Sequence, residues 1–249
     1  MRKSNVVICK QGSEHTFVDM NNQDFVLMLP KLKMVLDGCG SCACSEVGTK
    51  LFAQLFKSKY ETVCATSTIY SEKTENVAEG VKNENKSNIQ TTFITIVKEV
   101  FATLLNICLT DEFLFNNLCF TILVCIELDD EFIVFSCGDG YILTDNGETI
   151  EFIKLDDGEY PKYYAYNYVQ NIDCLQEYRD GVEFSIYHFS KPHYINVGVA
   201  TDGLRFYNGL NTIEKNKLFV ALKDGKMGKI GMLINRNAQI FKDDISICF

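Results

Sequence analysis

The sequence predicts an α+β fold, because strands and helices each gather in groups along the chain. Apolar runs of strand length follow one another after Asn117, separated by turn signals such as Gly-Asp-Gly at residues 138–140 and Asn-Gly at residues 146–147. Apolar residues at helical spacing form separate segments, and alternating βαβ units are absent. The chain has 249 residues, 47% of them hydrophobic, and no linker rich in Pro or Gly divides it. We therefore expect a single domain over residues 1–249.

The first half of the chain predicts short strands followed by two helices. Strands are expected at residues 5–10, 24–30 and 31–37. A helix should begin at Ser45, whose side chain can cap the first turn. The polar segment 71–90 predicts a solvated loop or a poorly packed helix end, and a second helix should follow over residues 91–108. The residues expected to be buried on the two helices are Leu51, Phe52, Leu55 and Phe56 on the first, and Phe93, Val97, Val100, Phe101 and Leu104 on the second.

The second half predicts an antiparallel meander from about residue 118 onward. Two further strands are expected within residues 183–190 and 194–203. Helices are expected over residues 211–223 and 229–241, before a last strand at residues 244–249. The tyrosine-rich segment 163–168 is expected to pack against the fold or cover it.

Charge and cysteine content limit the partners and the compartment. The formal net charge of -9 disfavours nucleic acid, whose binding needs clustered Lys and Arg, and suits cations instead. The sequence shows no secretory signal, and its longest apolar runs are about half the length that crosses a bilayer. Eleven cysteines in a chain of this size indicate reduced thiols rather than a disulfide framework. We expect a cytoplasmic monomer with no nucleic-acid or membrane partner.

Four acids share one setting at the edges of apolar strands: Asp37, Asp139, Asp202 and Asp243. Three of them are followed directly by glycine, which permits a tight turn and lets a cation or a water approach the backbone. One Asp-Gly pair alone is usually just a turn. The repetition of the pattern favours a joint role in binding a cation.

Five short segments follow one another along the chain: NNQD at 21–24, VLDGCGS at 35–41, SCGDG at 136–140, ATDGL at 200–204 and KDDISI at 242–247. In this order they resemble the motifs of the protein phosphatase 2C type of metal-dependent serine/threonine phosphatases. The resemblance spans nearly the whole chain. It implies a four-layer α/β/β/α sandwich of two antiparallel sheets flanked by helix pairs, with a two-metal centre at one end.

The resemblance also implies a role for each acid. Asp37 would bridge two divalent cations, Mn²⁺ or Mg²⁺, and the Gly38 carbonyl would bind one of them. Asp202 and Asp243 would bind the other, and Asp139 with Asp202 would offer a weak third site. Asp24 would support catalysis from behind these ligands. Such oxygen ligands suit hard cations, which lower the pKa of a bound water so that it can attack phosphorus in phosphoserine or phosphothreonine of a phosphoprotein.

Three positions depart from the family pattern. Gln23 stands where an acid is usual, and the arginine that clamps the substrate phosphate would fall near Asp19, so that contact is missing or comes from elsewhere, such as Lys10. Tyr141 replaces another arginine. The loss of a phosphate clamp weakens substrate positioning and leaves the metal ligands untouched. The alternative function is therefore a phosphatase-like binding or regulatory module with little or no hydrolytic activity.

Cysteine and histidine suggest two further alternatives. Cys39, Cys42 and Cys44 have a spacing that zinc could use, but a closed site needs a fourth ligand and the chain has no second Cys-x-x-Cys pair. We therefore favour packing for these thiols. His15, upstream of the NNQD segment, is a possible proton donor, whereas His188 and His193 are expected to be structural.

Overall fold

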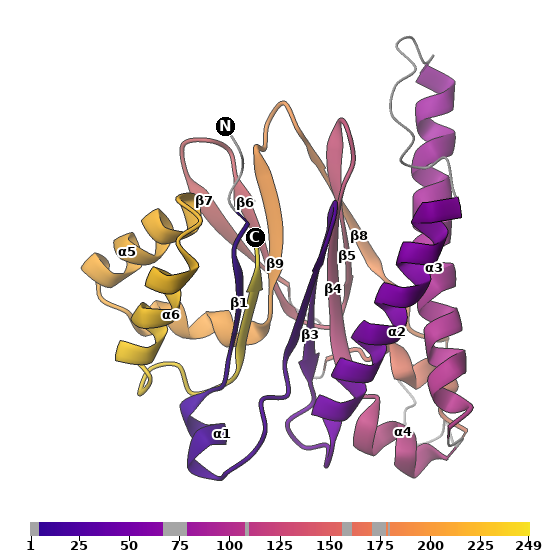
Figure 1. Ribbon diagram of the computed structural model, residues 1–249, viewed down its shortest axis with the longest axis horizontal. Coiled ribbons are helices and arrows are strands. Elements are labelled where there is room, and N and C mark those ends of the chain that lie inside the picture. The colour runs from indigo at the N-terminus through magenta and orange to yellow at the C-terminus, as the bar shows by residue number, and fades with distance from the viewer. Residues whose placement is uncertain (1–4, 67–78, 108–109, 156–160, 171–177, 179) are drawn as a thin grey trace. The chain divides into compact units, whose positions relative to one another are not determined.

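The computed structural model describes residues 5–66, 79–107, 110–155, 161–170, 178 and 180–249 (Figure 1). The chain divides into two compact units. Residues 1–49 and 111–249 form one, here the sheet unit, and residues 50–110 form the other, here the helix unit. The single domain expected over residues 1–249 stays a prediction.

The sheet unit contains two five-stranded sheets, and all neighbouring strands in both are antiparallel (Figure 1). The first sheet has, in spatial order, β1 (Val7–Lys10), β10 (Ile245–Cys248), β9 (Asn196–Ala200), β6 (Gly140–Asp145) and β7 (Ile150–Leu155). The second sheet has β2 (Phe25–Leu29), β3 (Leu32–Gly38), β4 (Phe120–Glu127), β5 (Glu131–Cys137) and β8 (Ser185–Ser190). The predicted α+β class with two antiparallel sheets is confirmed.

The predicted meander is divided between the two sheets. β4 and β5 pair in the second sheet, whereas β6 and β7 pair in the first. The chain crosses at Gly138 and Gly140, which have φ values of +101° and +140°. These backbone conformations suit glycine because L side chains rarely adopt them. The crossing places Asp139 in the turn that leads from β5 of the second sheet to β6 of the first sheet.

Side chains of the first sheet alternate between two cores. On β6, Ile142 packs with Val35 and Leu123 in a core that both sheets share. Its neighbours Tyr141 and Leu143 belong to the other core. Successive residues of a strand point to opposite faces, so one strand serves both cores.

The second core lies between the first sheet and two helices (Figure 1). These are α5 (Thr212–Lys223) and α6 (Met227–Arg236), and they bury Leu218, Leu222, Ile230 and Ile234. Asn211 begins α5 with a capping box, in which its side chain accepts from the Glu214 backbone N–H and Glu214 bonds back. α6 begins and ends earlier than predicted. Residues 237–240 follow it as turns, and the Asn237 side chain donates to the Leu233 carbonyl at its end.

The helix unit is built from α2 (Ser45–Thr66), which begins in the sheet unit, and α3 (Glu79–Leu105). Phe52 packs against Phe101 and Phe56 against Phe93, with tilted rings whose centroids lie 5.4 and 5.9 Å apart. The reversed order of these partners makes the helices antiparallel. Both predicted helices are confirmed. However, α3 already begins at residue 79, within the polar segment 71–90 that was predicted to be either a loop or a poorly packed helix end. Leu51 is 41% exposed, so its predicted burial was wrong, whereas the predicted stripe on α3 is buried.

In the part of the chain that the structure describes, four short helices were not predicted. They are α1 (Ser13–Phe17), α4 (Asp111–Asn117), η2 (Tyr164–Tyr168) and η4 (Asp202–Gly209). Tyr163 and Tyr164 are buried, as expected for a packed segment. Among the described residues, we find no helix with both the length and the apolar character needed to cross a membrane.

Candidate metal centre

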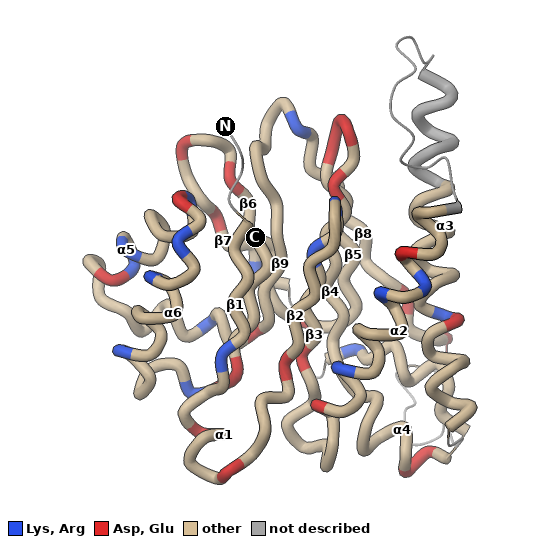
Figure 2. Tube along the Cα trace, viewed as in Figure 1, with Lys and Arg blue, Asp and Glu red and all other residues tan. Residues whose placement is uncertain are grey.

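A cavity of about 260 Å³ in the sheet unit brings the predicted metal-binding residues together. Its lining includes all five of them: Asp37, Gly38, Asp139, Asp202 and Asp243. Each residue comes from the end of a strand or from a turn between strands, because a sandwich of two sheets brings such ends to one edge. Figure 2 shows acidic residues near the ends of β2 and β3, on the side where α1 lies.

The two sheets contribute different ligand candidates. β3 of the second sheet ends in Asp37 and Gly38. Asp202 follows β9 of the first sheet, and Asp243 precedes β10. A Cβ atom on Gly38 would lie 2.8 Å from the Gln23 carbonyl oxygen and 2.7 Å from the Ser45 hydroxyl, so this turn is closely packed. The Ser45 hydroxyl donates to the Cys39 carbonyl at 3.1 Å, which fixes the strand end to the start of α2.

The carboxyl of Asp37 lies among other acids. Burial raises the pKa of Asp37 well above its usual range. The negative charges of Asp24, Asp243 and Asp139 raise it further. Like charges gathered in a poorly solvated place cannot all ionise cheaply, so the cavity favours a cation.

Asp24 lies behind the cavity and is 2% exposed. Burial raises the pKa of Asp24 to about 8. The Thr201 hydroxyl donates to Asp24 Oδ2 at 2.7 Å and opposes the rise, whereas the negative charges of Asp244 and Asp243 add to it. Within the described part of the chain, Asp24 Oδ1 has no hydrogen-bond partner. A buried carboxylate oxygen without a donor is costly unless a cation or an ordered water satisfies it.

Asp244 was not predicted as a site residue, yet it holds three segments together. Its carboxylate accepts from the backbone N–H groups of Gly12, at 2.8 Å, and Gln23, at 2.6 Å. It also lies 2.9 Å from His15 Nδ1. Gly12 and Asp244 are 232 positions apart, so only the fold reveals this contact.

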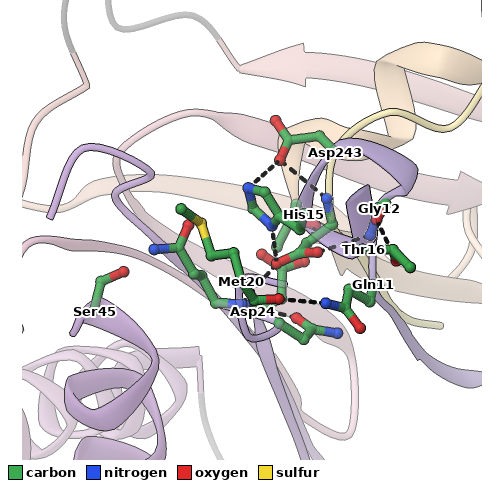
Figure 3. Close-up of polar contacts among 12 residues, drawn as sticks. Gln11, Gly12, His15, Thr16, Met20, Asp24, Ser45 and Asp243 are labelled. Carbon is green, nitrogen blue, oxygen red and sulfur yellow. Dashed lines mark hydrogen bonds and ion pairs between the residues drawn. The ribbon is translucent and has the colours of Figure 1, made fainter. Parts of the chain in front are cut away.

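His15 is the histidine that the fold brings to the cavity (Figure 3). Its Nε2 atom lies 3.8 Å from Asp243 Oδ1, while Nδ1 faces Asp244. His188 instead lies 3.2 Å from Glu131 on the second sheet, and His193 is exposed. His15 therefore has the position that a proton donor would need, whereas the other two do not.

Two of the cysteines beside Asp37 contact each other and a buried neighbour. The side chain of Cys42 raises the pKa of Cys39 to about 12, and the side chain of Cys119 does the same for Cys42. Cys44 is exposed. Packing stays the predicted role of the three cysteines that follow Asp37.

Arg205 is a second residue that the sequence did not single out. Its guanidinium contacts Asp202 Oδ2 and, at 3.0 Å, Asp243 Oδ2. In the described part of the chain, no three acidic, histidine or cysteine side chains are already arranged around a common point. Two predicted ligands thus face an arginine in this conformation.

Similar folds occur in solved phosphatases. A mutant bacterial serine phosphatase has a TM-score of 0.63 and 16% identity, with 100% of this chain and 97% of that chain covered. The serine/threonine phosphatase Stp1 from Staphylococcus aureus has a TM-score of 0.60 and 15% identity, with 100% and 94% covered. The catalytic domain of the serine/threonine protein phosphatase PstP, solved with two manganese ions, has a TM-score of 0.53 and 11% identity, with 98% and 95% covered.

The sequence itself matches the family model of protein phosphatase 2C over residues 11–224. The chain therefore belongs to the protein phosphatase 2C family, and the predicted class of metal-dependent protein phosphatase is confirmed. The match contains four of the five proposed metal-binding residues, and Asp243 lies beyond its end. No curated protein matches the sequence.

Proposed function

We propose that the chain hydrolyses phosphoserine and phosphothreonine in proteins at the cavity that contains Asp37. The single observation that carries this proposal is the convergence of acids from both sheets on one cavity, where they raise the pKa of Asp37. Such mutual repulsion is a cost to the fold unless a bound cation offsets it. A function that uses divalent cations explains why the cost is retained.

The residues present fit two divalent cations such as Mn²⁺ or Mg²⁺. The donors assigned to the cations are carboxylate and carbonyl oxygens, which hard cations prefer, and Asp24 Oδ1 is buried without a partner behind them. We assign one cation to Asp37 and the Gly38 carbonyl, and the other to Asp37, Asp202 and Asp243. When bound, the cations supply a water of lowered pKa and neutralise charge on the phosphoryl group.

Other residues hold the ligand candidates in place and complete the cavity lining. Asp244 joins α1, the segment before β2 and the start of β10, so it fixes the backbone that carries Asp243. His15 is held by Asp244 at the cavity, where it can donate a proton to the leaving oxygen. The buried Tyr163 closes another part of the lining with a neutral hydroxyl, because burial raises its pKa.

We also propose that both units act together as one domain, in a cytoplasmic monomer. The described cysteines are all free thiols, which a reducing compartment maintains. A native mass spectrum with and without a phosphopeptide tests the oligomeric state, and a stable dimer would contradict the proposal.

The test of the proposed function is metal removal and return. The purified chain, treated with a chelator and dialysed, should hydrolyse a phosphothreonine peptide at background rate, and Mn²⁺ or Mg²⁺ should restore hydrolysis. Released phosphate is the measurement, and Ca²⁺ or Zn²⁺ at equal concentration serves as the comparison. Tight Mn²⁺ binding without hydrolysis of several phosphopeptides would contradict the proposal and favour a binding module.

Asp139 provides a separate prediction, for a weak third cation that it would share with Asp202. Asp139→Ala should lower turnover about tenfold at low metal concentration, because the ligand set around the weak site is incomplete. Higher metal concentration should recover part of the loss. Thermal melting should be nearly unchanged, since Gly138 and Gly140 set the turn.

The matched control for Asp139 is Asp129→Ala, which changes an aspartate with a 98% exposed side chain in another turn. Its turnover should equal that of the wild type at every metal concentration. If Asp139→Ala behaves in the same way, Asp139 is a turn residue and the third site is not formed.

A further inference from the structure

One arginine joins two carboxylates that the proposed function assigns to a cation. Arg205 lies on η4, three residues after Asp202, and its guanidinium contacts Asp202 Oδ2. The same guanidinium donates to Asp243 Oδ2 at 3.0 Å and lies over the ring of Phe206, with its carbon 4.8 Å from the ring centroid. A planar guanidinium presents two nitrogen atoms in a fixed geometry to two acceptors at once, whereas a lysine presents all its donors from one nitrogen atom.

On Asp243, Arg205 contacts the oxygen that is more available to a cation. Asp243 Oδ1 already accepts from the Asp244 backbone N–H at 3.0 Å and faces His15. Its Oδ2 atom is therefore the freer oxygen, and this is the atom that Arg205 contacts. A metal ion and a guanidinium cannot occupy the same side of one carboxylate oxygen, because both need direct contact with it.

Other basic side chains at the cavity do not have this arrangement. Lys242 lines the cavity, but its Nζ lies 3.4 Å from Glu14 rather than between the ligand candidates. The Arg205 side chain is 46% exposed, so it has space to leave the two carboxylates. Its long side chain also permits a new rotamer without a change of η4.

From these contacts we infer that Arg205 is an internal competitor of the metal ion. It neutralises Asp202 and Asp243 in the metal-free protein and must release both before a cation can bind between them. The inference rests on the proposed function, because it takes these two aspartates as ligands. Its consequence is a metal affinity below that of the bare carboxylates, since part of the binding free energy is used to displace the guanidinium.

Metal binding itself, rather than catalysis, tests the inference. Isothermal titration of Mn²⁺ into metal-free protein should show about three- to tenfold tighter binding for Arg205→Gln than for the wild type, a range set by two partly exposed ion pairs. Arg205→Lys, which keeps the charge but presents all its donors from one nitrogen atom, should have an affinity between those of the wild type and Arg205→Gln. The control Arg236→Gln removes an equal charge from the exposed end of α6 and should bind as the wild type does.

The possible outcomes separate this inference from the proposed function. Equal Mn²⁺ affinity in the wild type and Arg205→Gln, or weaker binding in the variant, overturns the inference alone. Wild-type affinity in Arg205→Lys overturns the part played by the two-armed contact, because the charge at residue 205 alone would then set the affinity. Absence of Mn²⁺ binding in every protein overturns the proposed function as well. Circular dichroism melts verify that the variants are folded.

Discussion

Replacing Asp37 with asparagine should lower Mn²⁺-dependent hydrolysis of a phosphomonoester about a thousandfold. Asp37 is the proposed bridge between two cations, and the amide of asparagine carries no charge to hold them together. Loss of Lewis-acid stabilisation worth about 4 kcal/mol corresponds to that factor. Steady-state rates at saturating Mn²⁺ are the measurement.

The same substitution should leave the metal-free fold intact or make it more stable. The pKa of Asp37 is raised in the folded state, so the carboxyl is harder to ionise there than in the unfolded chain. At pH 7 the ionised form therefore lowers the free energy of unfolding, and an uncharged amide removes that cost. Melting of metal-free protein tests this, with the exposed Asp130→Asn as the control. Near wild-type turnover in Asp37→Asn would contradict the metal-bridging role.

The acids that the sequence did predict share a local signature. Asp37, Asp139 and Asp202 each precede a glycine at the edge of an apolar strand, and these features are visible within a few residues. The strands themselves were predictable because apolar runs bounded by turn residues fix them locally. The structure adds that the three positions line one cavity.

The residues that were missed depend on distant segments. Asp244 has no local pattern that separates it from Asp243, and its partners Gly12 and Gln23 lie more than two hundred positions away. Arg205 could have been noticed as a basic residue three positions after Asp202, the spacing that brings side chains together on a helix. Its second contact, with Asp243, needed the fold.

The division of the meander between two sheets was missed for a similar reason. β4 to β7 have the same local pattern of apolar runs and turns, so the sequence does not distinguish a turn within a sheet from a crossing between sheets. The Gly-Asp-Gly at residues 138–140 can serve either purpose. Packing decides, because Ile142 and Val199 of the first sheet bury against Leu123 and Val134 of the second.

Changing Gly203 to alanine should damage both the fold and the metal centre, with a loss of about 3 kcal/mol or more in the free energy of unfolding. A Cβ atom at this position would lie 1.8 Å from the Asp244 carbonyl oxygen and 3.3 Å from the Ile245 Cα. These are backbone atoms, so no side chain can move aside, and η4 must shift away from the start of β10. That shift would separate Asp202 from Asp243 and weaken Mn²⁺ binding.

Urea unfolding and Mn²⁺ titration measure the two effects of Gly203→Ala. The matched control is Gly228→Ala on α6, because its Cβ would meet nothing within 4 Å. Alanine at residue 228 should stabilise the chain by up to about 1 kcal/mol. Unchanged stability in Gly203→Ala would show that η4 and β10 are not packed as closely as the contact at Gly203 requires.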